Sequence, residues 1–252
     1  MKAIILAAGT GSRLLPYTKD KPKCLVEING TALLDRQIAI LSAAGIQEVV
    51  VVGGYCADAL KNHAPVLRMN PRYRETNMVS TLFCAERDLI GACIISYGDI
   101  VYSKKILSEL LIANDDISVA IDMNWKQYWN ARSENPIEDA ETLRINKDGH
   151  LLEIGQKPNT LEEIEGQYMG LMKFSEMGIK TLKDSYHQSN RNGYIRGKKI
   201  ENAYMTDLLQ HMIDSGHKIK AVPVADYWVE VDTVEDLKNP VTEDRVAKID
   251  NG

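Results

Sequence analysis

The sequence predicts an α/β fold, in which a Rossmann-like, mixed but mainly parallel sheet is flanked by helices and a small β-rich subregion follows. Strand and helix patterns alternate through residues 1–121, which is typical of βαβ units. The expected strands are continuous apolar runs, as in parallel strands that are buried on both faces. Several of these runs end in glycine-containing loops, and open α/β sheets bind ligands outside the carboxyl ends of their strands.

The first half contains most of the expected sheet. An apolar strand is expected at residues 2–7. A helix is expected at 31–44, because the apolar residues of this segment share one helical face and Gly45 ends the pattern. Asn77 suits the N-cap of a later helix. The other elements expected here are a strand at 46–52, a short helix from residue 58, a helix at 78–89, a strand at 92–97, a helix at 104–112 and a strand at 117–121.

The composition changes after residue 121, where the periodic patterns become weaker. A hairpin is expected at 143–154 around the turn Asn146–Gly149, and an amphipathic helix at 204–215 ends at Gly216. Further strands are expected at 169–174, 219–224 and 228–231. We interpret residues 1–252 as a single domain with halves at 1–121 and 122–238 and a polar, peripheral tail at 239–252.

The composition limits the class of protein. A net charge of −5 over 252 residues disfavours nonspecific binding to nucleic acid or to an anionic membrane. The apolar run after Lys2 is too short for a secretion signal, and no segment approaches the roughly 20 apolar residues of a membrane span. The four cysteines form no C-x-x-C pair, which favours reduced thiols. We therefore expect a cytoplasmic protein.

The most informative segment is the loop after the first strand. It reads Ala8-Gly-Thr-Gly-Ser-Arg13, and Lys23 lies ten residues further on. Small residues let several backbone N–H groups point at one anion. Arg13 and Lys23 add cationic donors for phosphate oxygens. These features predict a site for a nucleoside triphosphate, with a plain strand-to-helix turn as the alternative for this segment taken alone.

Two better-known glycine loops do not fit this segment. The dinucleotide fingerprint G-x-G-x-x-G needs Gly or Ala at position 14, which is Leu14, so a dehydrogenase is disfavoured. A Walker loop needs a Gly-Lys pair at a spacing that neither Gly9 nor Gly11 provides.

Two aspartates are candidate metal ligands. Asp99 and Asp232 each follow an apolar strand, which directs their carboxylates towards the ligand-binding edge of the sheet. Mg²⁺ prefers one or two carboxylates and completes its coordination with phosphate oxygens and water. Each aspartate alone is more often a turn or capping residue, but the pair forms a candidate Mg²⁺ site.

Four ordered motifs resemble those of the nucleotidyltransferases that make activated sugars and activated phospho-alcohols. The motifs are Leu6-Ala-Ala-Gly-Thr-Gly-Ser-Arg13 with Pro22-Lys23, Gly98-Asp99, Gln156-Lys157-Pro158 and Glu230-Val-Asp232, and they span nearly the whole chain. The resemblance implies a nucleotide-binding half at 1–121, an acceptor-binding half at 122–238 and Mg²⁺ as the cofactor. In the catalytic set that it implies, Lys23 contacts the nucleotide's phosphates, Arg13 the leaving pyrophosphate, and Asp99 and Asp232 the metal.

The resemblance also implies a nucleotide and its binding residues. The segment Glu75–Thr81 is closer to that of cytidylyltransferases acting on phosphocholine and related compounds than to that of sugar nucleotidyltransferases. CTP is therefore favoured over UTP or dTTP. The residues expected to bind the nucleotide are Leu6, Ala7, Ala8, Gly9, Thr10, Gly11, Arg13, Lys23, Gly54, Tyr55, Asn77, Ser80 and Gly98.

The acceptor site is less sharply defined. Lys157 matches the family lysine that holds the acceptor's phosphate, although Gln156 replaces the usual Glu. The segment Trp125–Glu141 holds aromatic residues, which suit a trimethylammonium head, and charged residues, which suit an amino-acid-like acceptor, and the sequence leaves both open. The residues expected to bind the acceptor are Lys157, Trp129, Arg132, Glu141, Tyr204, Asp207, Trp228 and Glu230.

The resemblance therefore implies a Mg-dependent cytidylyltransferase that transfers CMP from CTP to a small phosphorylated amine or amino acid and releases pyrophosphate, for the decoration of cell-surface polysaccharide. A sugar-1-phosphate nucleotidylyltransferase and a catalytically silent, nucleotide-binding regulatory relative are the alternatives. CTP and the acceptor are the expected partners, without nucleic acid or membrane, and a homodimer is left open.

Overall fold

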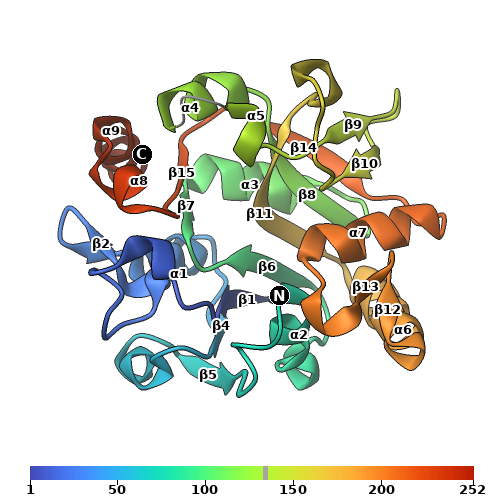
Figure 1. Cartoon of the computed structure of the whole chain (residues 1–252), viewed down its shortest axis with the longest axis horizontal. Coiled ribbons are helices and arrows are strands. Elements are labelled where there is room, and N and C mark those ends of the chain that lie inside the picture. Colours follow the sequence, from blue (N-terminus) through green and yellow to red (C-terminus); the bar gives the residue numbers. More distant parts are fainter. Residues whose placement is uncertain (133–135) are drawn as a thin grey trace.

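The computed structural model describes residues 1–132 and 136–252. Its centre is a seven-stranded sheet in the order β14-β8-β11-β6-β1-β4-β5 (Figure 1). Neighbouring strands are parallel, except that β11 runs antiparallel between β6 and β8, which confirms the predicted mixed, mainly parallel sheet. The strands are β1 (Lys2–Ala7), β4 (Glu48–Gly53), β5 (Val66–Met69), β6 (Cys93–Tyr97), β8 (Ile117–Asp122), β11 (Gln167–Phe174) and β14 (Lys220–Val224).

Helices cover both faces of this sheet. Along β1, Ile5 faces the layer that contains α1 and α3, whereas Ile4 and Leu6 face the layer of α2, α6 and α7. Both faces are therefore buried, which is why the strands are continuous apolar runs. The helices are α1 (Leu33–Ala43), α2 (Met78–Phe83), α3 (Lys104–Ile112), α4 (Trp125–Arg132), α5 (Pro136–Asp139), α6 (Glu176–Asn192), α7 (Met205–Asp214), α8 (Val234–Lys238) and α9 (Pro240–Asn251).

Short pairs of strands complete the fold. The antiparallel pairing of β7 with β15 brings together the segments that carry Asp99 and Asp232. β9 and β10 form the predicted hairpin. The strands of these pairs and of the two remaining ones are β7 (Ile100–Tyr102) with β15 (Trp228–Glu230), β9 (Leu143–Ile145) with β10 (Leu151–Ile154), β2 (Glu27–Ile28) with β3 (Thr31–Ala32), and β12 (Tyr194–Ile195) with β13 (Lys198–Lys199).

Three helical segments differ from the sequence-based expectation. The sequence does not predict α6, because this helix is mostly polar and buries few apolar side chains, among them Ile179 and Leu182. Residues 125–132 form α4 although their pattern has no clear period. The helix expected at 78–89 ends at Phe83, and a short 3₁₀ turn follows at Glu86–Asp88.

The C-terminal residues form α9, which packs on the core. The side chain of Asn239 accepts a hydrogen bond from the N–H of Val241, so it caps a helix that begins with a proline. Thr242, Val246 and Ile249 recur at helical spacing and are buried. The prediction of a peripheral tail did not anticipate this contribution to the core, because three residues on one helical face are easily overlooked in a polar stretch.

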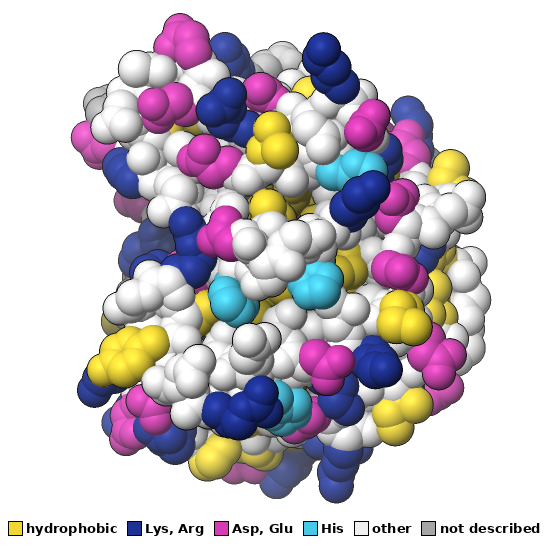
Figure 2. Space-filling view, turned by 90° about the vertical axis from the view of Figure 1, so that its right-hand side faces the viewer, with side chains coloured by type: hydrophobic (Ala, Val, Ile, Leu, Met, Phe, Trp, Pro, Cys, Tyr) yellow, Lys and Arg dark blue, Asp and Glu magenta, His cyan; other side chains and the backbone are white. Residues whose placement is uncertain are grey.

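The surface mixes charges of both signs. On the face shown in Figure 2, Lys and Arg side chains are interspersed with Asp and Glu, and hydrophobic side chains are scattered. That face therefore lacks the basic stripe expected of a nucleic-acid-binding surface. Within residues 1–132 and 136–252, no helix is both long enough and apolar enough to cross a bilayer.

Replacing Ile249 by Ala should lower the free energy of unfolding by about 2–5 kcal/mol, because a buried isoleucine leaves a cavity that its neighbours fill only in part. Ile249 is 4% exposed, whereas Ile112, also in a helix, is 76% exposed. The control Ile112→Ala should therefore change stability by less than about 0.5 kcal/mol. Urea unfolding followed by circular dichroism measures both, and equal effects would contradict the packing of α9 on the core.

Candidate active site

Two adjoining cavities open beside the carboxyl ends of β1 and β6. The first cavity, of about 360 Å³, surrounds the loop after β1, and the second, of about 330 Å³, lies against the start of β11. Because β11 is antiparallel, its first residues lie at the same edge as the carboxyl ends of its neighbours. The residues that line both cavities are Arg13, Met78, Tyr97, Glu230 and Asp232.

The loop after β1 is held in place by close backbone contacts. Gly11 has a φ of 59°, in the left-handed region that favours glycine, and a Cβ there would lie 3.0 Å from the Cβ of Lys23. The hydroxyl of Thr18 donates to the carbonyl oxygen of Gly11 at 2.8 Å. At the end of β6, the N–H of Gly98 donates to the carbonyl of Leu6 at 2.8 Å, and a Cβ on Gly98 would lie 2.8 Å from the same oxygen. Glycine at these two positions lets Lys23 and the end of β6 approach the loop.

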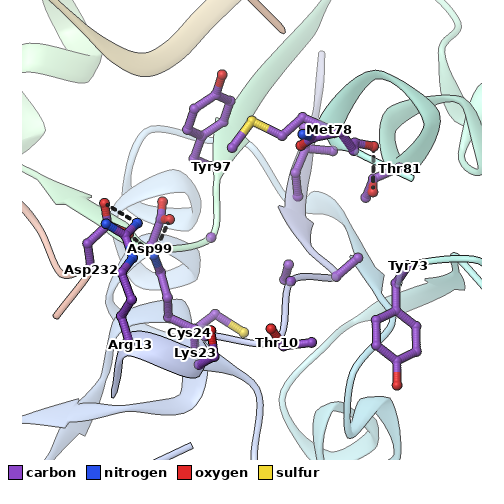
Figure 3. A pocket seen from close by; sticks show the side chains of 18 of the residues that line it. Thr10, Arg13, Lys23, Cys24, Tyr73, Met78, Thr81, Tyr97, Asp99 and Asp232 are labelled. Atoms are coloured by element: carbon purple, nitrogen blue, oxygen red, sulfur yellow. Dashed lines mark hydrogen bonds and ion pairs between the residues drawn. The ribbon is translucent and has the colours of Figure 1, made fainter. Parts of the chain in front are cut away.

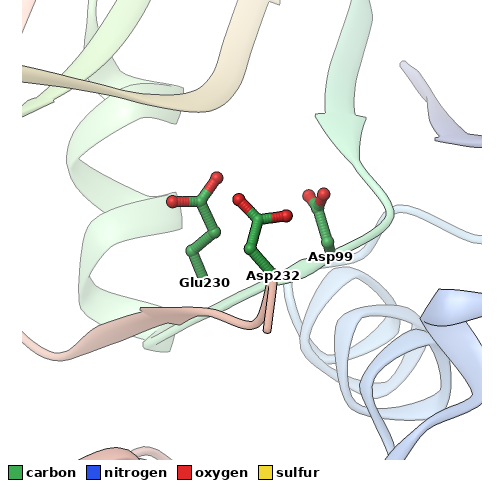
Figure 4. A group of neighbouring side chains, drawn as sticks. All are labelled: Asp99, Glu230 and Asp232. Carbon is green, nitrogen blue, oxygen red and sulfur yellow. The ribbon is translucent and has the colours of Figure 1, made fainter. Parts of the chain in front are cut away.

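Three carboxylates, from Asp99, Glu230 and Asp232, meet in the wall of the first cavity (Figure 4). The β7–β15 pairing continues into this cluster, since the N–H of Val231 donates to the carbonyl of Asp99 at 3.1 Å. One carboxylate oxygen from each residue lies within 4.8 Å of the other two. Oδ1 of Asp99 is buried without a hydrogen-bond partner, so a cation there would satisfy it. An all-oxygen set of this kind suits a hard divalent cation such as Mg²⁺.

The ammonium of Lys23 lies between two of these carboxylates (Figure 3). Its Nζ is 2.7 Å from Oδ2 of Asp99 and also pairs with Oδ1 of Asp232. Burial lowers the pKa of Lys23, but the two aspartates outweigh burial and raise the pKa well above its ordinary value. Nη2 of Arg13 lies 3.3 Å from Oδ2 of Asp232, and the Arg13 side chain is 62% exposed. Burial raises the pKa of Asp232, but the positive charges of Lys23 and Arg13 lower it by more than burial raises it. The pKa of Asp232 therefore falls below its ordinary value.

The second cavity is acidic. Its wall contains Asp139, Glu141, Glu230 and Asp232, and Arg13 is the one Lys or Arg among the described residues that line it. A ligand that brings positive charge would therefore be favoured in this cavity over one that brings only negative charge.

Glu141 is fixed in the wall of the second cavity through its backbone. Nε2 of Gln167 donates to the carbonyl of Glu141 at 2.8 Å, and Oε1 of Gln167 accepts from the N–H of Glu141 at 3.4 Å. Burial and the neighbouring Asp207 and Asp139 raise the pKa of Glu141 to about 7, against the opposing effect of Lys198. The charge of this wall therefore changes near neutral pH.

Aromatic side chains complete the second cavity. The rings of Tyr97 and Tyr168 lie 5.8 Å apart in an edge-to-face arrangement, and Trp129 and Tyr204 also line the cavity. Aromatic rings next to carboxylates are a suitable environment for a cationic head group.

Most of the residues predicted for the nucleotide line the first cavity, but Gly54, Tyr55 and Ser80 do not. Tyr55 supports the loop, because its N–H donates to the carbonyl of Ala8 at 3.1 Å. The hydroxyl of Ser80 donates to the carbonyl of Glu201 at 3.4 Å. These three residues are therefore outside the lining of the first cavity. The predicted residues that line the first cavity are Leu6, Ala7, Ala8, Gly9, Thr10, Gly11, Arg13, Lys23, Asn77, Gly98, Asp99 and Asp232.

Half of the predicted acceptor residues line the second cavity: Trp129, Glu141, Tyr204 and Glu230. Lys157 does not; its side chain is exposed, and Nζ donates to the backbone carbonyls at positions 137 and 138. Glu134 belongs to the segment Trp125–Glu141, which was predicted to contain acceptor-binding residues, but it lies outside the described residues.

The other three predicted acceptor residues have partners within the protein. Nε1 of Trp228 donates to Oδ2 of Asp122 at 2.9 Å. Asp207 accepts from Nζ of Lys198 at 2.8 Å and caps α7. Arg132 pairs with carboxylates on β15 and α8. The structure thus places Trp228, Asp207 and Arg132 in the support of the second cavity rather than in its lining.

Several residues that line the cavities were not predicted from the sequence. Tyr97 is the last residue of an apolar strand, a position that could have identified it. The residues at the start of β11 could not be identified in this way, because a single sequence does not show which strand of a sheet is reversed. The further lining residues that are absent from the predicted site residues are Ser12, Cys24, Tyr73, Thr76, Met78 and Thr81 in the first cavity and Asp139, Gln167, Tyr168, Met169, Gly170 and Thr206 in the second.

Known proteins share this sequence pattern and fold. Residues 3–153 match the family model of the MobA-like NTP transferase domain. The chain is 42% identical over 250 residues to the CTP:phosphoglutamine cytidylyltransferase of Campylobacter jejuni, covering 94% of this chain and 98% of that protein. It is 34% identical over 114 residues to the choline-phosphate cytidylyltransferase of Streptococcus pneumoniae, covering 44% of this chain and 50% of that protein. The inositol-1-phosphate CTP transferase of T. maritima has the same fold, with a TM-score of 0.77 at 21% identity over 100% of this chain and 96% of that one.

Replacing Lys23 by Met should let the three carboxylates bind a divalent cation more tightly in the absence of nucleotide. The ammonium of Lys23 now occupies the space between Asp99 and Asp232. A unit charge at about 4 Å contributes about 4 kcal/mol at an effective dielectric constant of about 20. Its removal should lower the dissociation constant of Mn²⁺ by at least about tenfold, as measured by electron paramagnetic resonance.

Lys21→Met is the matched control, because Lys21 pairs with Glu27 outside the cluster, and it should leave the Mn²⁺ affinity unchanged. An unchanged affinity in Lys23→Met would contradict the interpretation of the three carboxylates as a cation site.

Proposed function

Because the chain belongs to the family of MobA-like NTP transferase domains, we propose that it is a cytidylyltransferase, which transfers CMP from CTP to a small phosphorylated amine or amino acid and releases pyrophosphate. One observation carries the proposal. A cavity lined by the glycine-containing loop after β1 adjoins an acidic, aromatic cavity, and Arg13, Glu230 and Asp232 lie where the two meet. The full-length likeness to a phosphoglutamine cytidylyltransferase supports the reaction and the class of acceptor.

CTP would occupy the first cavity. Its phosphates would lie against the loop after β1, where nothing lies within 4 Å of the position that a Cβ of Gly9 would take. Arg13 and Lys23 would donate to the phosphate oxygens. The base would lie towards Asn77, whose side chain is fixed by accepting the N–H of Met78 at 2.9 Å. The preference for CTP over UTP and dTTP rests on the segment that contains Asn77.

Mg²⁺ fits the cluster of Asp99, Glu230 and Asp232, with Asp99 and Asp232 as the principal ligands. When bound, the ion would offset the negative charge that develops on the phosphates. Lys23 now pairs with both aspartates, so its ammonium would move towards the nucleotide as the ion takes its place.

The reaction requires little proton transfer by protein groups. A phosphate oxygen of the acceptor attacks the α-phosphorus of CTP, and the bond from that phosphorus to the bridging oxygen breaks, so that pyrophosphate leaves with the electron pair. The acceptor's phosphate is already anionic near neutral pH, so it needs no strong base. Lys23 and Arg13 contribute by positioning the phosphates and by stabilising charge in the transition state.

The second cavity supports an acceptor with a positively charged group. Asp139 and Glu141 supply carboxylates, and Trp129 and Tyr204 supply aromatic surface. A hexose 1-phosphate brings only negative charge and hydroxyls, and therefore suits this wall less well. Lys157 remains a proposed ligand of the acceptor's phosphate from its place in the motif, and its ammonium would first have to leave two backbone carbonyls. The resemblance also supports a cytoplasmic enzyme whose product serves surface polysaccharide decoration.

A screen of pyrophosphate release tests the reaction. With Mg²⁺ and a phosphorylated amine or amino acid, CTP should react at least about tenfold faster than UTP or dTTP, which is within the range that binding-site contacts discriminate. The control Asp232→Asn should lower the rate on the order of 100-fold, because it removes a preorganised charge. Faster reaction with hexose 1-phosphates would favour the sugar alternative, and no reaction with any pair would favour a regulatory relative.

The acceptor's KM should depend on the charge of Glu141. Its pKa is about 7, so the carboxylate becomes charged as the pH rises from 6 to 8 and then attracts an ammonium group. The KM of an amine-bearing acceptor should fall by up to about tenfold over this range, in proportion to the ionised fraction. The charged groups that face Glu141 or share its cavity are Asp139, Asp207, Lys198, Glu230, Asp232 and Arg13.

Glu141→Gln provides the control for this pH dependence. The acceptor's own phosphate also titrates near pH 6, and the variant retains that contribution. Burial and the neighbouring Asp232 also raise the pKa of Glu230 to about 7, and the variant retains this contribution too. In Glu141→Gln the acceptor's KM should therefore stay above the wild-type value at pH 8 and fall less over the range than in wild type, while the KM of CTP is unchanged. The same pH dependence in wild type and variant would show that Glu141 does not bind the acceptor's head group.

A further inference from the structure

Arg132 ends α4 and lies against the segment that carries two of the three clustered carboxylates. Its Nη1 is 2.9 Å from Oε2 of Glu230, and its Nε is 3.0 Å from Oδ1 of Asp236. Its guanidinium lies 5.2 Å from the ring centroids of both Tyr128 and Trp129. The Arg132 side chain is only 6% exposed. Its donors and faces are therefore already in contact with protein groups.

Asp236 transmits this contact to the turn between β15 and α8. Its Oδ2 accepts the N–H groups of Asp232 and Thr233, each at 3.0 Å, and the Thr233 hydroxyl at 3.1 Å. The same oxygen receives Nη2 of Arg132 at 3.3 Å. The backbone of Asp232 is thus bonded to a carboxylate that the guanidinium of Arg132 holds in place.

The strand end before the turn is fixed from the same helix. The N–H of Glu230 donates to the hydroxyl of Tyr128 at 3.0 Å, and that hydroxyl donates to the carbonyl of Glu230 at 3.4 Å. Trp129, one residue further along α4, lines the second cavity. One helix therefore forms part of the acceptor wall and also fixes the Glu230–Asp232 segment.

We propose that Arg132 is a positioning residue for the transfer reaction, which sets Asp232 against Asp99 and holds Glu230 at the junction of the two cavities, and that it does not bind the acceptor. The proposal rests on the proposed function. An acceptor carboxylate could reach Arg132 only by displacing Glu230 or Asp236, which would leave a buried carboxylate without its partner. Such a loss is strongly unfavourable.

The test compares Arg132→Met with Arg245→Met. Arg245 is a matched control, because its guanidinium lies 4.1 Å from the ring centroid of Tyr128 and donates to the carbonyl of Trp228, outside the carboxylate cluster. Arg132→Met should weaken Mn²⁺ binding in the presence of CTP and lower kcat, each by about 10–100-fold, as is typical when a residue that orients a metal ligand is lost. The loss in kcat should be equal for a phosphorylated amine and a phosphorylated amino acid, and Arg245→Met should be close to wild type in both measurements.

Arg132→Lys keeps the charge but cannot hold Glu230 and both oxygens of Asp236 with one planar group. It should therefore restore only part of the Mn²⁺ affinity and of kcat. If Arg132→Met does not fold, as judged by its melting temperature, the Mn²⁺ affinity of Arg132→Lys decides instead.

Two results would overturn the proposal. The first is a rise in KM that is confined to acceptors bearing a carboxylate, with Mn²⁺ affinity unchanged, because this would make Arg132 an acceptor ligand. The second is wild-type Mn²⁺ affinity in every Arg132 variant. The Mn²⁺ measurement does not depend on turnover, so a failure of the proposed reaction is distinguishable from a failure of the role given to Arg132.

Discussion

The charges of the site depend on the pairing of β7 with β15. This pairing brings together Asp99 and Asp232, which are far apart in the sequence. Two partly buried carboxylates at such proximity repel each other unless a cation lies between them. Lys23 supplies that cation, with its ammonium in contact with both. The group that is suited to a nucleotide's phosphates therefore also stabilises the carboxylate cluster before a metal or a nucleotide binds.

A second constraint is the reversal of β11 within an otherwise parallel sheet. Because β11 runs antiparallel between β6 and β8, its first residues lie beside the carboxyl ends of those strands. The pairing of β11 with β8 shifts register between Tyr168 and Met172. Such an irregularity changes the direction in which side chains point at the edge of a sheet. Tyr168 then lies edge-to-face with Tyr97 at the end of β6. The second cavity thus exists beside the first because one strand is reversed.

The lining of the first cavity was more predictable than that of the second, for a physical reason. The loop after β1 is contiguous in sequence, so the small residues Gly9 and Gly11 and the cation Arg13, which line the first cavity, can be recognised from a local pattern. The second cavity depends on contacts between distant segments. No local pattern shows that Arg132 faces the buried Asp236, so the sequence alone suggests a free guanidinium available to a ligand. Helix α6 escaped prediction for a related reason, because only its packing shows which of its few apolar residues face the core.

The geometry of in-line transfer and the charges of the two cavities together determine which substrate each cavity can hold. The entering and leaving oxygens must lie on opposite sides of the α-phosphorus, so the acceptor's phosphate and the pyrophosphate must extend in different directions from the junction. The carboxylates of Asp139 and Glu141 line the second cavity and would repel a triphosphate there. An acceptor with an ammonium group would instead offset that charge and could extend its phosphate to the junction of the two cavities. The acidic wall would therefore act on both substrates, by attracting the acceptor and by confining the nucleotide to the first cavity.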